Sequence, residues 1–469
     1  MSARTDEAAG GAAPGDDPGL LTPAQTSLLI DQYELAMAAS YLERGMNEPA
    51  VFELFVRELP PQRDWLLVAG LGPALRLVAE LAFGDEELAY LRALGFRPAL
   101  LRFLERFRFS GEVDAMPEGT VAFAGEPLVR VTAPRVEAQL LETLLLNQVN
   151  FQTAIATKAA RVVLAAGGGE VGAGERVVDF SPRRDHGVDA AMKAARCAAI
   201  AGAGGTSNVA AAMRYGLRPV GTMAHSYVMS FADEQAAFEA FMRDTPENTI
   251  LLVDTYDTLQ GVRHAIAAAR ATGVALMGVR LDSGDLLALS RGARALLDEA
   301  GMPDAAVVAS GDLEEGQIAR LVAAGAPIDV WGVGTELGTS RDAPALGGVY
   351  KLVADAAPGG GWRPVWKRSP AKATIPAPKQ VLRRYDGDGT MRGDLVVEAS
   401  ERGEGRPLLE RFVTGGELVR REPLAALRER ARGELAALPA PLRRPGERPS
   451  TPYPVACSER LLALRPGTG

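Results

Sequence analysis

Three short segments in the middle of the chain combine glycine with charged side chains. They are RLDSGD at residues 280–285, ASGD at 309–312 and WGVGTELG at 331–338. Each adjoins an apolar run and precedes a helical pattern, which is the position of a turn between a strand and a helix. Backbone N–H groups at such a turn are unpaired and carry partial positive charge, so they bind phosphate.

Carboxylates in these segments add a second capability. Asp282 and Asp312 could hold sugar hydroxyls or Mg²⁺ beside a phosphate, which suits a phosphorylated sugar. Glycine and aspartate are also common in turns that bind nothing. One segment alone is therefore ambiguous, whereas three in series favour a phosphate site.

A further charged segment, DFSPRRDHG, covers residues 179–187. Adjacent Arg183 and Arg184 could form a forked set of donors for a phosphate or a carboxylate. Alternatively, they belong to a solvated run of charge in which Asp185 pairs at the surface. The residues alone leave both interpretations open.

Histidine occurs only three times in the 469 residues. His264 falls off the apolar stripe of its helical segment, which predicts an exposed and inert side chain. His186 lies in the arginine segment, where it could touch a ligand. His225, in GTMAHS, follows an apolar run in a loop without charges of its own, so it could be structural or catalytic.

The composition excludes several classes of protein. The net charge is −8 and the basic residues are spread along the chain, so there is no basic patch of the kind that nucleic acid requires. The two cysteines, Cys197 and Cys457, fit a reducing compartment, and we expect the cytoplasm. No run of about 18 apolar residues predicts a membrane span.

The first part of the chain divides into a tail and a mixed domain. We expect disorder over residues 1–18, which carry glycine and acidic residues but no apolar segment. Residues 19–150 combine apolar residues at helical spacing with a short strand pair in GTVAFAGEPLVRVTA. This pattern predicts an N-terminal α+β domain.

Residues 151–369 alternate short apolar runs with alanine-rich helical segments, as strand–helix units of a parallel sheet do. Seven expected strands favour a barrel over an open sheet. Functional residues of such barrels lie at the carboxyl ends of the strands, where the glycine and aspartate segments fall. The seven runs are VVDF (177–180), RPVGT (218–222), TILLVDT (249–255), ALMGVRLD (275–282), AAVVASGD (305–312), DVWGVGT (329–335) and VYKLV (349–353).

The last part of the chain follows the turn-rich segment PGGGWRP. Residues 370–469 contain two strand-like runs and a charged helical segment, and we expect them to pack back onto the N-terminal domain. The predicted fold class is therefore α/β, with a barrel-like domain and a discontinuous α+β domain.

Six segments in this order resemble the nicotinate phosphoribosyltransferase family of NAD salvage. They are RRDHGVDAAMKAARCAAIAGAGGTSN, GTMAHSYVMSFADE, LLVDTYDTL, GVRLDSGDL, WGVGTEL and GGVYKLV, and the likeness extends from about Leu28 to about Arg384. It implies an irregular α/β barrel, a composite N-terminal domain and a homodimer with shared active sites. The implied reaction joins nicotinate to 5-phosphoribosyl-1-diphosphate with Mg²⁺ and ATP, as an enzyme of the ligase class.

The resemblance also implies roles for individual residues. His225 matches the histidine that ATP phosphorylates. Arg183, Thr222 and Arg280 match residues around nicotinate, and an arginine suits its carboxylate. Tyr33 matches a tyrosine that reaches the substrate ring from the neighbouring subunit.

A second set of residues matches the site of the phosphoribosyl donor, with Mg²⁺ held through its diphosphate. The sequence departs from the family near Thr374, because Pro370 and Ala377 replace the usual acidic residue and glycine. The residues matching the donor site are Asp282, Gly311, Asp312, Gly334, Thr335 and Thr374.

Several questions remain open at this level. Asp233 and Glu234 are close to His225 in sequence, and either could orient its ring. The same chemistry on nicotinamide or quinolinate is one alternative, although GTMAHS and GVRLDSGDL favour nicotinate. A non-catalytic protein that binds a phosphorylated sugar is another, and the presence of Arg280, Asp282 and His225 argues against it.

Overall fold

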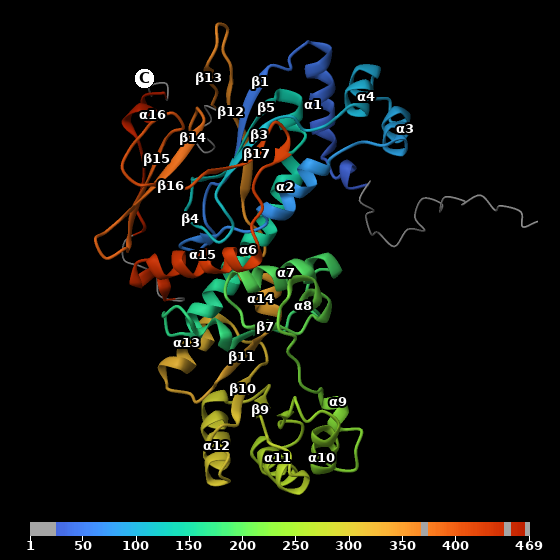
Figure 1. Cartoon of the computed structure of the whole chain (residues 1–469), viewed down its shortest axis with the longest axis vertical. Helices are drawn as coiled ribbons and strands as arrows, with labels where there is room; N and C mark the ends of the chain where they lie inside the picture. The colour runs from blue at the N-terminus through green and yellow to red at the C-terminus, as the bar shows by residue number, and fades with distance from the viewer. Residues whose placement is uncertain (1–24, 367–373, 445–451, 465–469) are drawn as a thin grey trace, which may run out of the picture.

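The computed structural model describes residues 25–366, 374–444 and 452–464 (Figure 1). The tail expected at residues 1–18 and the unusual Pro370 lie outside these ranges. Figure 1 shows two lobes along the long axis, an upper lobe with antiparallel sheet and a lower lobe with parallel sheet. The long helix α6 (Glu142–Ala166) is almost entirely buried and packs against elements of both lobes.

The upper lobe contains a seven-stranded antiparallel sheet assembled from distant parts of the chain. Its interior strand β1, with the sequence PAVFELFV, is rich in the β-branched and aromatic residues that favour strands. The strands in spatial order are β13 (Trp362–Pro364), β12 (Gly348–Ala356), β1 (Pro49–Val56), β5 (Pro127–Pro134), β3 (Glu112–Ala115), β17 (Glu410–Thr414) and β18 (Glu417–Leu418).

Helices and two smaller sheets complete the upper lobe. The helices are η1 (Gln25–Leu28), α1 (Gln32–Glu43), α2 (Leu71–Glu80), α3 (Asp85–Ala93), α4 (Pro98–Glu105), α5 (Arg135–Gln139), α15 (Leu424–Ala437), η4 (Ala440–Arg443) and α16 (Glu459–Ala463). The smaller sheets comprise β2 (Leu66–Leu67) with β4 (Val121–Ala122), and β16 (Arg406–Pro407), β14 (Lys379–Tyr385), β15 (Met391–Glu398) and β19 (Val455–Cys457).

A buried ion network joins the C-terminal elements of the upper lobe. The side chain of Arg383 is fully buried and lies 2.6 Å from Asp394 and 2.7 Å from Glu434. Glu434 also accepts a hydrogen bond from the backbone N–H of Val121 at 3.1 Å. Because a buried charge is tolerated only when it is paired, these contacts hold β14, β15 and α15 against the N-terminal segment.

The lower lobe is a curled, six-stranded parallel sheet flanked by helices. Its strands in spatial order are β7 (Gly205–Thr206), β6 (Val177–Asp179), β11 (Val330–Val333), β10 (Ala306–Ala309), β9 (Gly278–Leu281) and β8 (Ile250–Leu252). The helices are η2 (Ala173–Arg176), α7 (Val188–Ile200), α8 (Val209–Tyr215), α9 (His225–Val228), α10 (Glu234–Asp244), α11 (Thr258–Thr272), α12 (Leu286–Glu299), α13 (Glu315–Ala323) and α14 (Thr335–Thr339).

This architecture confirms the predicted fold class and corrects two of the seven strands. The run at 349–353 belongs to β12, which pairs antiparallel with β1 in the upper lobe. β12 has nine residues, whereas no strand of the parallel sheet exceeds four, so its length matches the long β1 instead. The run at 218–222 forms only an isolated bridge between Pro219 and Thr206. The parallel sheet is therefore a half-barrel.

The described helices also bear on the expected absence of a membrane span. None of them combines the length and the apolar character that crossing a bilayer demands.

Candidate active site

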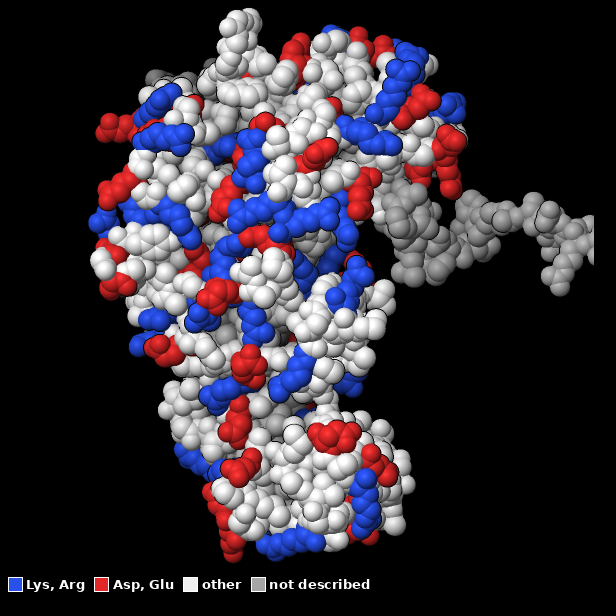
Figure 2. Space-filling model, in the orientation of Figure 1, with Lys and Arg blue, Asp and Glu red and all other residues white. Residues whose placement is uncertain are grey.

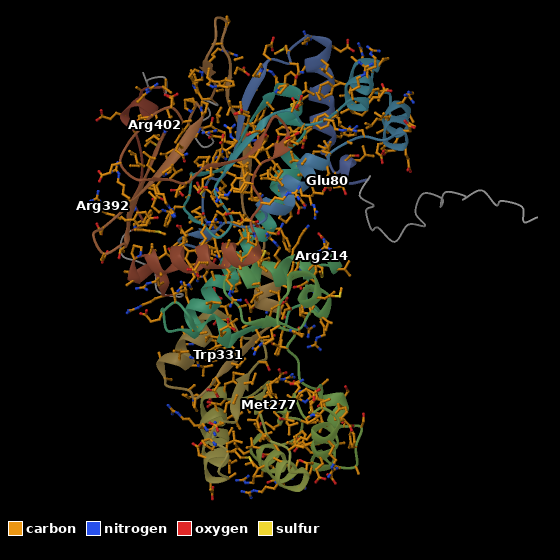
Figure 3. The ribbon with its side chains drawn as sticks, viewed as in Figure 1. Glu80, Arg214, Met277, Trp331, Arg392 and Arg402 are labelled. Carbon is orange, nitrogen blue, oxygen red and sulfur yellow. The ribbon has the colours of Figure 1, made fainter. Side chains whose placement is uncertain are left out.

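The carboxyl ends of the parallel strands bring most of the predicted site residues to one edge of the sheet. Strands β6, β11, β10 and β9 are consecutive neighbours and parallel, so the loops that follow them lie side by side. These loops carry Arg183, Gly334, Asp312 and Asp282 in that order. In Figure 3, the labelled Trp331 in β11 and Met277 just before β9 mark this sheet.

Arg280 and Thr222 form a well-defined polar contact at this edge. Nη1 of Arg280 donates a hydrogen bond to Oγ1 of Thr222 at 2.5 Å, and Nη2 lies 3.9 Å from Oδ1 of Asp282. The Nε of Arg280 is buried and has no acceptor among the described residues. Burial lowers the pKa of Arg280, Asp282 partly offsets this, and the charge of Arg183 adds to it. A guanidinium with unused donors and limited hydration is suited to bind a carboxylate.

Asp282 is fixed from two neighbouring loops. Its Oδ1 accepts a hydrogen bond from Oγ of Ser310 at 2.5 Å. Its backbone N–H donates to Oδ2 of Asp254 at 2.9 Å. A carboxylate held in this way can present its remaining acceptor positions to the hydroxyls of a sugar.

Gly311 allows the loop after β10 to approach Asp282 closely. Its φ is +87°, and a Cβ at this position would lie 1.9 Å from the carbonyl oxygen of Asp282. The next residue, Asp312, also has a positive φ, of 45°. Gly334 follows β11 and leads directly into α14 at Thr335. These two short turns expose backbone close to the carboxylates, as a phosphate site requires.

A buried lysine connects the helices that follow these two turns. Nζ of Lys158, on α6, lies 2.5 Å from Glu315 at the start of α13 and 3.3 Å from Glu336 in α14. It also lies 2.9 Å from Asp342, which pairs with Arg63 of the upper lobe at 2.5 Å. The network therefore fixes the two turns relative to each other and to the upper lobe.

His225 begins α9, and its ring contacts a hydroxyl group. Nδ1 of His225 lies 3.1 Å from Oγ1 of Thr255, in the loop after β8. No hydrogen bond from a described residue reaches Nε2. Asp233 accepts from the backbone of Ala236 at the start of α10, and Glu234 contacts a different histidine. Neither carboxylate considered for orienting the ring of His225 contacts it.

That other histidine is His264. Its Nδ1 lies 2.8 Å from Oε2 of Glu234, and its side chain is 32% exposed. The sequence predicts an exposed and inert His264, whereas the side chain is partly buried and paired, because a helical residue off the apolar stripe can still contact a neighbouring helix. Here α10 packs against α11 and supplies the carboxylate.

The arginine segment separates into an exposed part and an anchored part. Arg183 and Arg184 are exposed, and their side chains form no ion pair with a described residue. Asp185 instead accepts a hydrogen bond from Oγ of Ser181 at 3.0 Å. Burial and the charge of Asp179 raise the pKa of Asp185 to about 6. The surface pairing considered for Asp185 is therefore absent, while His186 is exposed in the same loop.

Two of the predicted site residues, Tyr33 and Thr374, lie in the upper lobe, away from the carboxyl ends of the parallel strands. Tyr33 on α1 is 48% exposed and lines a cavity of about 370 Å³ together with Glu142 and Asn150. None of the predicted strand-end residues lines that cavity. Thr374 is buried and lies before β14.

Three further polar residues contribute contacts at the edge, although the sequence patterns do not single them out. Asp254, Thr255 and Ser310 contact Asp282 or His225 directly. They could have been found from their position in the sequence, because each lies near the end of one of the apolar runs that form β8 and β10.

The strand-end carboxylates are the candidate ligands for a metal ion. Among the described residues, no group of three or more His, Cys, Asp or Glu side chains could hold a metal ion. Mg²⁺ commonly binds through one or two carboxylates together with substrate phosphates. Asp282 and Asp312 could fit that limited role.

Comparison with known proteins identifies the family. The model of the nicotinate phosphoribosyltransferase N-terminal domain matches residues 28–150, and the model of the nicotinate phosphoribosyltransferase family matches residues 176–320. Nicotinate phosphoribosyltransferase pncB2 of Mycobacterium tuberculosis is 47% identical over 441 residues, which cover 93% of this chain and 92% of that protein. The chain belongs to the nicotinate phosphoribosyltransferase family.

Other relatives agree with this membership. Nicotinate phosphoribosyltransferase of Bacillus subtilis is 46% identical over 363 residues, covering 76% of this chain and 73% of that protein. The crystal structure of human nicotinic acid phosphoribosyltransferase superposes with a TM-score of 0.79 at 29% identity, over 92% of this chain and 98% of that one. The resemblance noted in the sequence is thereby confirmed, and the fold of this chain matches that of the human protein.

Proposed function

We propose that this chain transfers the phosphoribosyl group of 5-phosphoribosyl-1-diphosphate to nicotinate, forming nicotinate mononucleotide and diphosphate in NAD salvage. The observation that carries the proposal is the placement of Arg280, with an unused buried donor, beside Asp282 and the turn at Gly311. Residues suited to bind a carboxylate thus lie beside residues suited to bind a phosphorylated sugar. Family membership supports the same reaction.

The acceptor half of the site would bind nicotinate through its carboxylate. Arg280 supplies the charged donor, and Thr222 fixes its orientation through the 2.5 Å hydrogen bond. Exposed Arg183 adds a second cation on the same side. Nicotinamide has no carboxylate, so it would leave the buried Nε–H of Arg280 without a charged acceptor, which is costly.

The donor half would hold the ribose and its phosphates. Asp282 and Asp312 accept hydrogen bonds from ribose hydroxyls, and Gly311, Gly334 and Thr335 surround the 5′-phosphate. The bond from ribose to diphosphate breaks as the pyridine nitrogen attacks the same carbon, and positive charge develops on the ribose. Mg²⁺, when bound through the diphosphate, neutralises charge on the leaving group.

His225 would couple this transfer to ATP, which would place the enzyme in the ligase class. Thr255 can accept a hydrogen bond from Nδ1–H, and this tautomer leaves the lone pair of Nε2 available. Nε2 attacks the γ-phosphorus of ATP, forming a nitrogen–phosphorus bond as the bond to ADP breaks. The phosphoryl group adds negative charge beside the donor site, which can alter donor binding.

Tyr33 and Thr374 would act across a subunit interface. Both lie in the upper lobe, apart from the strand ends, and Tyr33 leaves about half of its side chain exposed beside a cavity. We therefore propose a homodimer in which each upper lobe completes the strand-end site of its partner, in the cytoplasm. Sedimentation or light scattering tests the dimer, and a monomer with full activity would contradict it.

The experiment for the coupled reaction uses nicotinate, the phosphoribosyl donor, Mg²⁺ and ATP labelled at the γ-phosphate. Product analysis should show nicotinate mononucleotide, and the protein should carry acid-labile phosphate. His225→Ala should abolish both the phosphoprotein and the ATP dependence while leaving slow transfer. Unchanged ATP dependence in that variant would contradict the role of His225 without affecting the transferase proposal.

A further inference from the structure

A cavity of about 760 Å³ lies between the lobes, away from the strand-end site. Its walls are formed by α2 and the segment 418–422 from the upper lobe, and by α6, α7 and α8. None of the residues proposed to bind nicotinate, the donor or ATP lines it. The volume falls within the range of about 300–1,000 Å³ that is usual for small-molecule sites.

The floor of the cavity is formed by an ion pair between Arg196 and Glu118. Arg196 on α7 donates two hydrogen bonds of 2.8 Å to the carboxylate of Glu118. Glu118 also accepts from the backbone N–H groups of Gly70 and Gly72, at 2.6 and 3.1 Å. These contacts use the carboxylate fully and fix α7 to the start of α2. The floor is therefore rigid and electrically neutral.

The rim of the cavity carries excess positive charge. Apart from the floor pair, five lining side chains are cationic and two are carboxylates. Arg76 and Arg420 also pair with Glu80 and Glu410, which do not line the cavity. Arg214 and Arg421 are exposed, and neither has a carboxylate partner within the described parts of the chain. Figure 3 places Arg214 where α7 and α8 face α2, and Figure 2 shows basic side chains gathered across the middle of this face. The rim is suited to an anion, and paired arginines favour phosphate.

The interior between floor and rim is mostly apolar, with one unsatisfied acceptor. Leu75, Met192 and Phe412 line it and could contact a flat ring. Gln152 also lines it, and the Oε1 of this fully buried residue has no hydrogen-bond donor in the described structure. A buried acceptor without a partner is unfavourable, and rotation of the Gln152 side chain toward the cavity would let a ligand amino or hydroxyl group satisfy it.

We propose that this cavity binds a phosphorylated nucleoside, with its phosphate on Arg214 and Arg421. The base would lie against the apolar wall, and a donor group of the base or ribose would reach Gln152. Each part of the cavity then has a chemical counterpart in one ligand. The binding site goes beyond the proposed function and does not depend on it.

The position of α7 gives such a ligand a route to the catalytic loop. α7 begins at Val188, five residues after Arg183, and its residues Met192 and Arg196 line the cavity. A ligand that restrains α7 would also restrain the loop before it. We therefore expect an altered KM for nicotinate when the cavity is filled, and this part of the inference rests on the proposed function.

The test measures binding of AMP by calorimetry to the full chain with nicotinate mononucleotide saturating the strand-end site. Arg214→Glu combined with Arg421→Glu should weaken AMP binding about tenfold or more, and adenosine should bind correspondingly more weakly than AMP to the unaltered chain. The control combines Arg392→Glu with Arg402→Glu, two exposed arginines that Figure 3 labels on the far side of the upper lobe. It should bind AMP like the unaltered chain.

Three results would overturn the site. AMP fails to bind, or it binds equally to both double variants, or the Arg214/Arg421 variant changes from a dimer to a monomer, which would make the rim an interface between copies. If AMP binds as expected but leaves the KM for nicotinate unchanged, the site stands and the coupling through α7 is wrong. A failure of nicotinate turnover itself would contradict the proposed function while leaving the binding result intact.

Discussion

Thr222 accepts a hydrogen bond of 2.5 Å from Arg280, although the two residues are 58 positions apart in sequence. Thr222 lies in the segment before α9, and Arg280 lies in the middle of β9. The contact links the segment before α9, which begins at His225, to the strand that Asp282 directly follows. It therefore connects the proposed sites for ATP, nicotinate and the donor.

Replacement of Arg280 should affect nicotinate more than any substrate without a carboxylate. Arg280→Gln removes the charge and should lower kcat/KM for nicotinate about 30-fold or more, because a buried charge-assisted contact contributes about 2–5 kcal/mol. Nicotinamide, if it reacts at all, should lose much less. Steady-state rates with both pyridines measure the difference. Thr222→Ser, which keeps the hydroxyl, is the control, and equal losses for both pyridines would contradict carboxylate binding.

Gly311 should tolerate no side chain, because two effects act there together. Gly311→Ala forces an unfavourable φ and places a Cβ against the carbonyl of Asp282, so it should raise the KM for the donor. Gly273→Ala is a matched control, since Gly273 has a φ of +71° and a Cβ there would meet no atom within 4 Å. Gly273→Ala should lower the free energy of unfolding by about 1 kcal/mol through strain alone, and Gly311→Ala should lower it by more. A normal donor KM in Gly311→Ala would exclude this turn from the site.

Ala377 offers a stabilising substitution. Its φ is +71°, which is unfavourable for alanine. Ala377→Gly should raise the free energy of unfolding by about 0.5–1 kcal/mol. Denaturant unfolding measures the change. Ala354→Gly, at a buried strand residue without a positive φ, should instead lower stability, and a loss in both variants would contradict the strain at Ala377.

Glu34 should make stability depend on pH near neutrality. Burial raises the pKa of Glu34 to about 7, and nearby Glu142 contributes to the rise. A raised pKa in the folded state means that the folded protein holds the proton more tightly than the unfolded chain. The stabilisation is therefore present below the ordinary pKa of about 4.3 and is lost as pH rises through about 7.

The variant Glu34→Gln isolates this effect. It mimics the protonated side chain, so its free energy of unfolding should fall less than that of the unaltered chain between about pH 5 and 8. Thermal or denaturant unfolding at several pH values measures both slopes. If the free energy of unfolding changed equally with pH in the variant and in the unaltered chain, Glu34 would not retain its proton in the folded state.

The sequence predicts the positions of the glycine- and aspartate-containing turns better than it predicts the sheet around them. RLDSGD and ASGD sit at strand ends because local polarity and glycine mark a turn, and neighbouring parallel strands then bring the turns together. The run at 349–353 is assigned to the wrong sheet because an apolar run carries no information about its pairing partner. Its partner β1 is some 300 positions away in sequence.

Side-chain partners are harder to predict than positions. Two carboxylates beside His225 in sequence are candidates for orienting its ring, whereas the contact comes from Thr255, 30 positions away. Asp185 is a candidate surface partner of the arginines next to it, yet it contacts Ser181. In both cases the direction of a side chain is set by the packing of loops and helices, which adjacency in sequence does not determine.

The measurement that tests the proposed function most directly is kcat/KM for nicotinate, nicotinamide and quinolinate, with 5-phosphoribosyl-1-diphosphate as the donor. The arrangement of Arg280, Thr222 and Asp282 predicts that nicotinate is the best acceptor and that nicotinate mononucleotide is the product. Faster turnover of nicotinamide or quinolinate, or no phosphoribosyl transfer to any of the three, would contradict it.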